Sequence, residues 1–186
     1  MPNMSSHMSI AKRVSEILDI DDKAFIIGNL LPDLEDDKRK SHYKIQGKLY
    51  LIPDIDRVEK ELDLNDKTNL GILTHLLLDK YYLEDYLIRY PEVDVFLEKD
   101  IYKDYDIYND RIVKYFDLDI DYLRSVLSEI KEKKYQEKLL KNINCLSIKE
   151  KGNTKYLKED FIDFLEDTSI RIANEIRKYC EKEKKI

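Results

Sequence analysis

Glycine and proline are scarce in this sequence, with 4 of each among 186 residues, and tryptophan is absent. A β-sandwich or barrel needs many more turn residues, so the composition predicts an all-α protein. The 2 cysteines, Cys145 and Cys180, are too few for a disulfide framework, and we expect free thiols in a reducing compartment. Apolar runs stay far below the roughly 18 residues that a membrane-spanning helix needs, so we expect no membrane insertion.

Charged residues make up 39% of the chain and hydrophobic residues 42%, a balance typical of a soluble globular protein. The net charge of −6 argues against general binding to nucleic acid or to anionic membranes. Residues 1–9 show no basic stretch followed by an apolar run, so we expect a cytoplasmic protein. The length favours a single helical domain over residues 1–186. The sequence favours no particular oligomeric state.

Apolar residues recur at helical spacing along most of the chain. Capping residues and prolines predict four helices in the first half: one from Ser5 or Ser6 through Leu18, one from Asp21 or Asp22 to Pro32, one from Pro53 through Leu62, and one from Asn65 or Asp66 to Pro91. Residues 33–51 are expected to form a long polar connection with about one helical turn. Further helices are expected near 109–117, 120–132, 134–144 and 157–183, the last divided near 167–169.

The clearest chemical pattern is Gly71-Ile-Leu-Thr-His75-Leu-Leu-Leu-Asp79, inside the fourth predicted helix. Residues four apart lie on the same face of a helix, so His75 and Asp79 can converge on one metal ion. Gly71 lies one turn earlier on that face and leaves room for a ligand or for another backbone. Taken alone, the pair also fits a structural role in which Asp79 only orients His75.

Two further segments offer ligands of the same kind. Asp33 follows a proline at the end of the second predicted helix, and His42 lies nine residues later in the polar connection. Each alone also fits a structural reading, Asp33 as part of a turn and His42 as an exposed side chain. With His75 and Asp79 they form a set of two imidazoles and two carboxylates, which suits zinc and which iron(II) or manganese would also accept. His7 supplies a fifth ligand if a second ion shares one carboxylate.

The order of these segments carries a resemblance. Ser5-Ser-His7, Phe25-Ile-Ile-Gly-Asn-Leu-Leu-Pro-Asp33, Ser41-His42 and Leu70-Gly-Ile-Leu-Thr-His75-Leu-Leu-Leu-Asp79 resemble the bacterial zinc-dependent phospholipase C family, whose helical fold is shared by fungal single-strand nucleases. The resemblance covers residues 1–90, about half of the chain, and leaves 91–186 as a helical remainder. It implies a multi-helix bundle of that type, in a short intracellular branch.

The resemblance also implies a set of roles. Asp33, His42, His75 and Asp79 would hold one metal, and His7 would bind a second that shares Asp79. Such a pair would turn a bridging water into hydroxide that attacks a phosphate ester, with Asp33 orienting the water. The family's third metal uses a further histidine, and none follows His75 here, so we expect one or two ions. The expected substrate is a small phosphate ester.

Two alternatives stay open. An HD-type phosphohydrolase is also helical, but its adjacent His-Asp pair is missing, since none of the three histidines is followed by Asp. A non-catalytic binding or scaffold protein with a structural or vestigial metal site would show the same residues. The leading hypothesis is a metal-dependent hydrolase.

Overall fold

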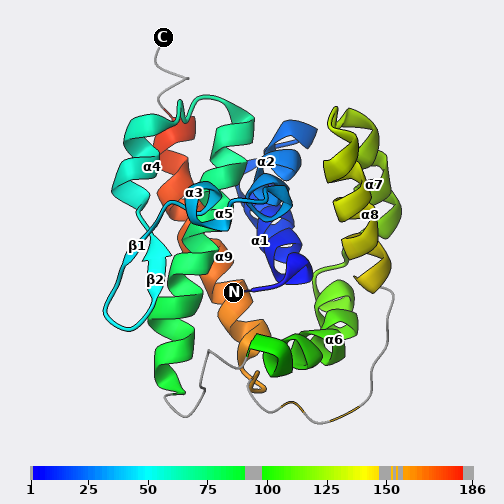
Figure 1. The fold of residues 1–186 in the computed structure, drawn as a ribbon. Helices are drawn as coiled ribbons and strands as arrows, with labels where there is room; N and C mark the ends of the chain where they lie inside the picture. The colour runs from blue at the N-terminus through cyan, green and yellow to red at the C-terminus, as the bar shows by residue number, and fades with distance from the viewer. Residues whose placement is uncertain (1, 91–97, 147–151, 153, 155–156, 182–186) are drawn as a thin grey trace.

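Helices make up most of the chain in a computed structural model, which describes residues 2–90, 98–146, 152, 154 and 157–181 (Figure 1). The helices are α1 (Met4–Leu18), α2 (Lys23–Leu34), α3 (Lys38–Ser41), α4 (Ile55–Glu61), α5 (Lys67–Tyr81), α6 (Glu98–Tyr115), α7 (Ile120–Val126), α8 (Lys133–Leu146) and α9 (Phe161–Cys180). The strands β1 (Lys44–Gln46) and β2 (Leu51–Pro53) form a small antiparallel hairpin. The all-α class is therefore confirmed. Among the described residues, no helix combines the length and apolar character needed to cross a membrane.

Helix α5 lies at the centre of the bundle, where it packs against α1, α2 and α9 (Figure 1). Helix α1 also packs along α9, so the first and last described helices lie side by side. Helices α7 and α8 form the opposite side from the hairpin and α4 (Figure 1). Ten of the residues of α5 are buried, among them Leu70, Leu73, His75 and Asp79. The candidate ligands of α5 thus lie in the interior of the bundle.

Helices α2 and α5 cross with their backbones in contact. A Cβ added at Gly71 would lie 2.1 Å from the carbonyl oxygen of Phe25, and one added at Gly28 would lie 1.9 Å from the carbonyl oxygen of Thr68. Real Cβ contacts are never this short, so each helix needs a glycine at the crossing. The expectation that Gly71 makes room for another backbone is met by the backbone of α2.

The predicted caps of α1 were wrong. The helix begins at Met4, and its cap is Asn3, whose side-chain oxygen accepts from the backbone N–H of Ser6 at 3.2 Å. Ser5 and Ser6 lie inside the helix and are buried. The hydroxyl of Ser5 donates to Asn109 on α6 at 2.7 Å, so it joins two helices instead of capping one.

The prediction that Pro32 ends the second helix was also wrong. Helix α2 continues through Pro32 to Leu34, and its cap at the start is Asp22 as predicted. Proline removes one N–H donor and restricts the residue before it, but the residues after it can still be helical. The last carbonyls of a helix have no backbone N–H to bond. At this end of α2, the carbonyl oxygen of Pro32 instead accepts hydrogen bonds from the side chains of Lys38 and Ser41.

Residues 33–51 are more ordered than a long connection. They include the end of α2, the single turn of α3 and strand β1, and they lead into β2. Pro53 closes β2 and does not begin a helix, because Asp54 is the residue that caps α4. The hairpin is closed where the N–H of Gly47 donates to the carbonyl of Tyr50 at 2.9 Å.

Three helix boundaries in the rest of the chain also differ from the predicted ones. Helix α5 gives way after Tyr81 to a π-helical turn, Tyr82–Tyr86, and a 3-10 turn, Leu87–Arg89, while Pro91 lies outside the described residues. Helix α6 is longer than the predicted 109–117, and the predicted helix 120–132 ends as a 3-10 turn at Glu129. Helix α8 matches the predicted 134–144 within two residues at each end.

Helix α9 is continuous, so the predicted division near 167–169 was wrong. Thr168 and Ser169 are buried on the inner face of the helix together with Ile172. The hydroxyl of Ser169 donates to the carbonyl of Glu166, one turn back, and therefore does not compete with the helix.

Candidate metal centre

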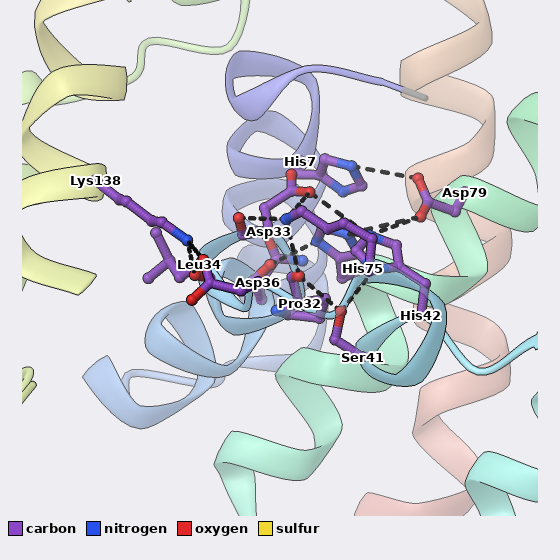
Figure 2. Close-up of polar contacts among 12 residues, drawn as sticks. His7, Pro32, Asp33, Leu34, Asp36, Ser41, His42, His75, Asp79 and Lys138 are labelled. Carbon is purple, nitrogen blue, oxygen red and sulfur yellow. Dashed lines mark hydrogen bonds and ion pairs between the residues drawn. The ribbon is translucent and has the colours of Figure 1, made fainter. Parts of the chain in front are cut away.

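All five predicted site residues lie together at one end of the α2–α5 crossing (Figure 2). Helix α1 contributes His7, α2 contributes Asp33, and α5 contributes His75 and Asp79. His42 is the C-cap residue that follows α3. Two groups have ligand atoms within 4.8 Å of one another: His7, His75 and Asp79 form one, and Asp33, His42 and His75 form the other. His42 is buried, with 2% exposure, so the reading of an exposed histidine was wrong.

The ring of His75 is held in one tautomer. Its Nδ1 lies 2.7 Å from the backbone carbonyl oxygen of Asn29, which can only accept, so we assign the proton to Nδ1. Nε2 then carries a lone pair. Burial is the main cause that lowers the pKa of His75 to about 3, and the nearby His7 is the next. The ring is therefore neutral near pH 7.

The ring of His42 is held in the same way. Its Nδ1 lies 2.9 Å from Oγ of Ser41, and that hydroxyl donates to the carbonyl of Pro32 at 3.0 Å. Because the Ser41 proton is used on Pro32, the hydroxyl accepts from Nδ1 of His42, and in the neutral ring Nε2 carries a lone pair. The two Nε2 atoms lie 3.3 Å apart. This distance would suit a hydrogen bond, but in the neutral rings neither Nε2 carries a proton to donate, so two lone pairs face each other.

Asp79 adds a negative charge to the same place. Its side chain has no exposed surface, and among the described residues neither carboxylate oxygen has a hydrogen-bond partner. Burial acts to raise the pKa of this carboxyl, but the neighbouring imidazoles, His7 foremost, lower it below its usual value. Oδ2 lies 3.6 Å from Nε2 of His42 and 3.7 Å from Nε2 of His75. A buried carboxylate without donors costs several kcal/mol unless a cation compensates it.

The separations fit a coordinated cation. Ligands about 2.0–2.1 Å from a tetrahedral zinc ion lie roughly 3.3–3.4 Å from one another. The three separations among His42, His75 and Asp79 run from 3.3 to 3.7 Å. Fixed Nε2 lone pairs, with Nδ1 held by a carbonyl or a hydroxyl, are also the arrangement that metal-binding histidines adopt. His7, His75 and Asp79 form one group that could hold a metal ion, and Asp33, His42 and His75 form another.

His7 faces the other oxygen of Asp79. Its Nε2 lies 3.4 Å from Oδ1, and its ring stacks on that of His75 with centroids 3.6 Å apart and planes 3° from parallel. The side chain is buried, and within the described residues neither ring nitrogen has a hydrogen-bond partner. Asp79 thus presents Oδ2 to His42 and His75, and Oδ1 to His7.

Asp33 is the one site residue that reaches the surface. Its side chain is 36% exposed, whereas those of the other four range from 0 to 2%. Oδ1 lies 3.5 Å from Nε2 of His42 and 3.3 Å from Nζ of Lys38. Burial of the carboxyl acts against ionisation, but contact with His42 and nearby charges hold the pKa of Asp33 well below its usual value. Asp33 is therefore the edge of the five-residue group that solvent reaches.

Sequence reasoning missed the groups that orient the ligands. These are the carbonyl of Asn29, the carbonyl of Pro32, the hydroxyl of Ser41 and the ammonium of Lys38. Ser41 stands next to His42, so its adjacency was a usable signal. A backbone carbonyl carries no side-chain signal, and nothing in the sequence pointed to Asn29.

Comparisons with protein-family models, with curated proteins and with solved structures find no match for this chain. The interpretation of the site therefore rests on its residues and their geometry.

Proposed function

We propose that this chain is a metal-dependent hydrolase of phosphate esters that uses zinc, with iron(II) or manganese as ions that the same ligands accept. The observation that carries the proposal is the convergence of two fixed Nε2 lone pairs, on His42 and His75, with the buried carboxylate of Asp79. The order of the ligand segments further supports a bundle of the phospholipase C and single-strand nuclease type.

Each residue has a distinct part in the proposed reaction. A bound cation would polarise a phosphoryl oxygen and lower the pKa of a bound water to about 7. Asp33, His42, His75 and Asp79 would hold this cation, while Asp79 Oδ1 and His7 offer a place for a second. Asp33 lies at the only exposed edge of the five-residue group. Its ionised carboxylate would bind the cation and orient the attacking water.

The test is metal content followed by catalysis. Protein purified without added metal is analysed for its elements, treated with chelator, and assayed with bis(p-nitrophenyl) phosphate. Bound metal, with release of p-nitrophenol that chelator abolishes and zinc restores, would support the hydrolase. A metal-free protein that zinc neither binds nor stabilises would overturn it. Asp33→Asn tests the role of Asp33, with weaker zinc binding and a rate at least tenfold lower in the zinc-loaded protein as the expected outcome.

One observation favours a second candidate, a scaffold protein with a structural metal site. Four of the five side chains are sealed from solvent, and structural zinc sites are closed whereas catalytic sites keep an open position. This candidate predicts bound metal and a melting temperature that falls on chelation, with no hydrolysis of any phosphate ester supplied. The exposed edge at Asp33 is the feature that sets the hydrolase above it.

A further inference from the structure

Lys38 stands at the exposed edge of the centre. Its Nζ lies 3.3 Å from Oδ1 of Asp33, and its side chain is 45% exposed. The same ammonium donates to the backbone carbonyls of Pro32 and Asp33 at the end of α2. Lys38 is therefore held in place by the backbone, and its charge lies beside the partly exposed carboxylate of Asp33.

The contact between Lys38 and Asp33 involves the oxygen that a cation would need. Oδ1 of Asp33 lies 3.5 Å from Nε2 of His42, so it is the oxygen that faces the other ligands. When this oxygen binds a divalent ion, its negative charge is shared with that ion, and its attraction for Lys38 falls. The bonds to the Pro32 and Asp33 carbonyls stay, because they do not depend on the carboxylate.

The remaining donor of Lys38 then has no strong acceptor. An ammonium has three N–H donors, and two are engaged by the carbonyls of α2. The third would be released at this exposed edge, beside Asp33 and already positioned. An ammonium whose position is fixed before binding loses little freedom when it takes an anion.

We propose that Lys38 is an anion-binding residue that receives a phosphoryl oxygen at this exposed edge, and that it does so only when the cation is bound. The inference rests on the proposed function and names the residue that recognises its substrate class. The charge of Lys38 would act on ground state and transition state alike, so its main effect falls on KM and on the affinity for inorganic phosphate.

The test measures the binding of inorganic phosphate by calorimetry to the zinc-bound and the zinc-free protein, together with metal content. The zinc-bound wild type is expected to bind phosphate, and the zinc-free protein at least tenfold more weakly. Lys38→Met should keep its zinc and lose at least tenfold in phosphate affinity, and Lys38→Arg should recover part of that loss. The matched control is Lys40→Met, since Lys40 is an exposed lysine on the same turn, and its ammonium makes no hydrogen bond or ion pair with the five site residues, all of which the structure describes.

Three results would overturn the inference. If Lys38→Met retained zinc and bound phosphate as tightly as the wild type, Lys38 would have no anion-binding role, while the proposed hydrolase would stand. If Lys38→Met lost zinc affinity but its zinc-bound fraction kept full phosphate affinity, Lys38 would only cap α2. If the wild type bound no zinc and hydrolysed no phosphate ester, the proposed function itself would fail, and this inference with it.

Discussion

Nε2 of His42 and Nε2 of His75 lie 3.3 Å apart, and each carries a lone pair because Nδ1 of its ring donates to a fixed acceptor. The acceptor for His42 is Oγ of Ser41, and that for His75 is the carbonyl of Asn29. A neutral ring could place its proton on Nε2 only by giving up the hydrogen bond that its Nδ1 donates. The arrangement is therefore matched to a cation between the rings.

Ser41→Ala tests this relationship. The change removes the acceptor for His42 Nδ1 and the donor to the Pro32 carbonyl, so the ring loses its fixed tautomer. We expect zinc affinity to fall by about 10–100-fold, measured by competition with a chromogenic chelator. Ser125→Ala is the control, since that hydroxyl donates to the carbonyl of Tyr122 on an exposed face of α7. Equal affinities in the two variants would show that Ser41 does not orient His42.

Asp79→Asn separates a metal ligand from a structural ion pair. In the metal-free protein the neighbouring imidazoles lower the pKa of Asp79, so the folded state favours the ionised carboxylate, and a neutral amide loses that attraction. We expect the free energy of unfolding of the metal-free protein to fall by about 1 kcal/mol. Zinc binding is expected to be lost. A fall of about 3 kcal/mol or more in urea denaturation would instead identify a buried ion pair with His7.

Metal stoichiometry tests whether Asp79 is shared. Its Oδ1 faces His7, whereas its Oδ2 faces His42 and His75. Asp79→Ala should therefore remove all bound metal, and His7→Ala should remove only one of two ions. Elemental analysis of the purified variants measures both, and an equal loss in the two variants would reject the shared ligand.

The metal-free protein should lose stability in mild acid. Burial lowers the pKa of His75 to about 3 in the folded state, and an unfolded histidine titrates near ~6.5. Between these values the unfolded chain takes up a proton that the folded chain refuses, so stability falls as pH drops. The slope from this residue is about 1.4 kcal/mol per pH unit. The carboxyls of Asp33 and Asp79 have lowered pKa values, so their contribution is lost only below ~3.9.

Urea denaturation at several pH values between 7 and 4 measures this dependence. His75→Asn removes the titrating group and keeps an amide that can donate to the Asn29 carbonyl. We expect the variant to show a shallower slope than the wild type over this range. Identical slopes would mean that the folded protein accommodates a proton on His75. Zinc affinity should fall over the same range, because the ligands must be deprotonated to bind.

The site was predictable from the sequence where helix periodicity alone determines geometry. Gly71, His75 and Asp79 lie on one face of α5 because they are four residues apart. Helix periodicity does not predict that His42, which lies outside α5, approaches this face. It depends on bonds from Lys38 and Ser41 to the backbone at the end of α2, which turn residues 35–41 back over the centre.

The fold was predictable in its class and in most of its helices, but less so at their limits. Composition indicated an all-α protein, yet the hairpin at Lys44–Pro53 consists of two three-residue strands without an Asn-Gly or Asp-Gly turn. Pro32 looked like a helix end because its own N–H is absent. The Pro32 carbonyl at this end of α2 accepts hydrogen bonds from the side chains of Lys38 and Ser41. These residues lie in the next segment, so the helix propensity of residues around Pro32 does not predict the bonds.

The crossing of α2 and α5 leads to the last prediction. A Cβ at Gly71 would lie 2.1 Å from the Phe25 carbonyl and 2.7 Å from the backbone nitrogen of Asn29, so Gly71→Ala forces the helices apart. The Asn29 carbonyl that orients His75 would move with α2. We expect a loss of roughly 1–3 kcal/mol or more in stability, together with loss of zinc binding.

Gly152→Ala is the matched control, because a Cβ there meets Ile107 at 3.4 Å, an ordinary contact. Thermal unfolding and zinc titration compare the two variants. If Gly71→Ala still folds, its zinc affinity separates the loss of stability from the loss of ligand positioning. A shift of α2 would move the Asn29 carbonyl and so reorient the His75 ring. A folded Gly71→Ala protein with the zinc affinity of the wild type would mean that the close contact of the two backbones does not position the ligands.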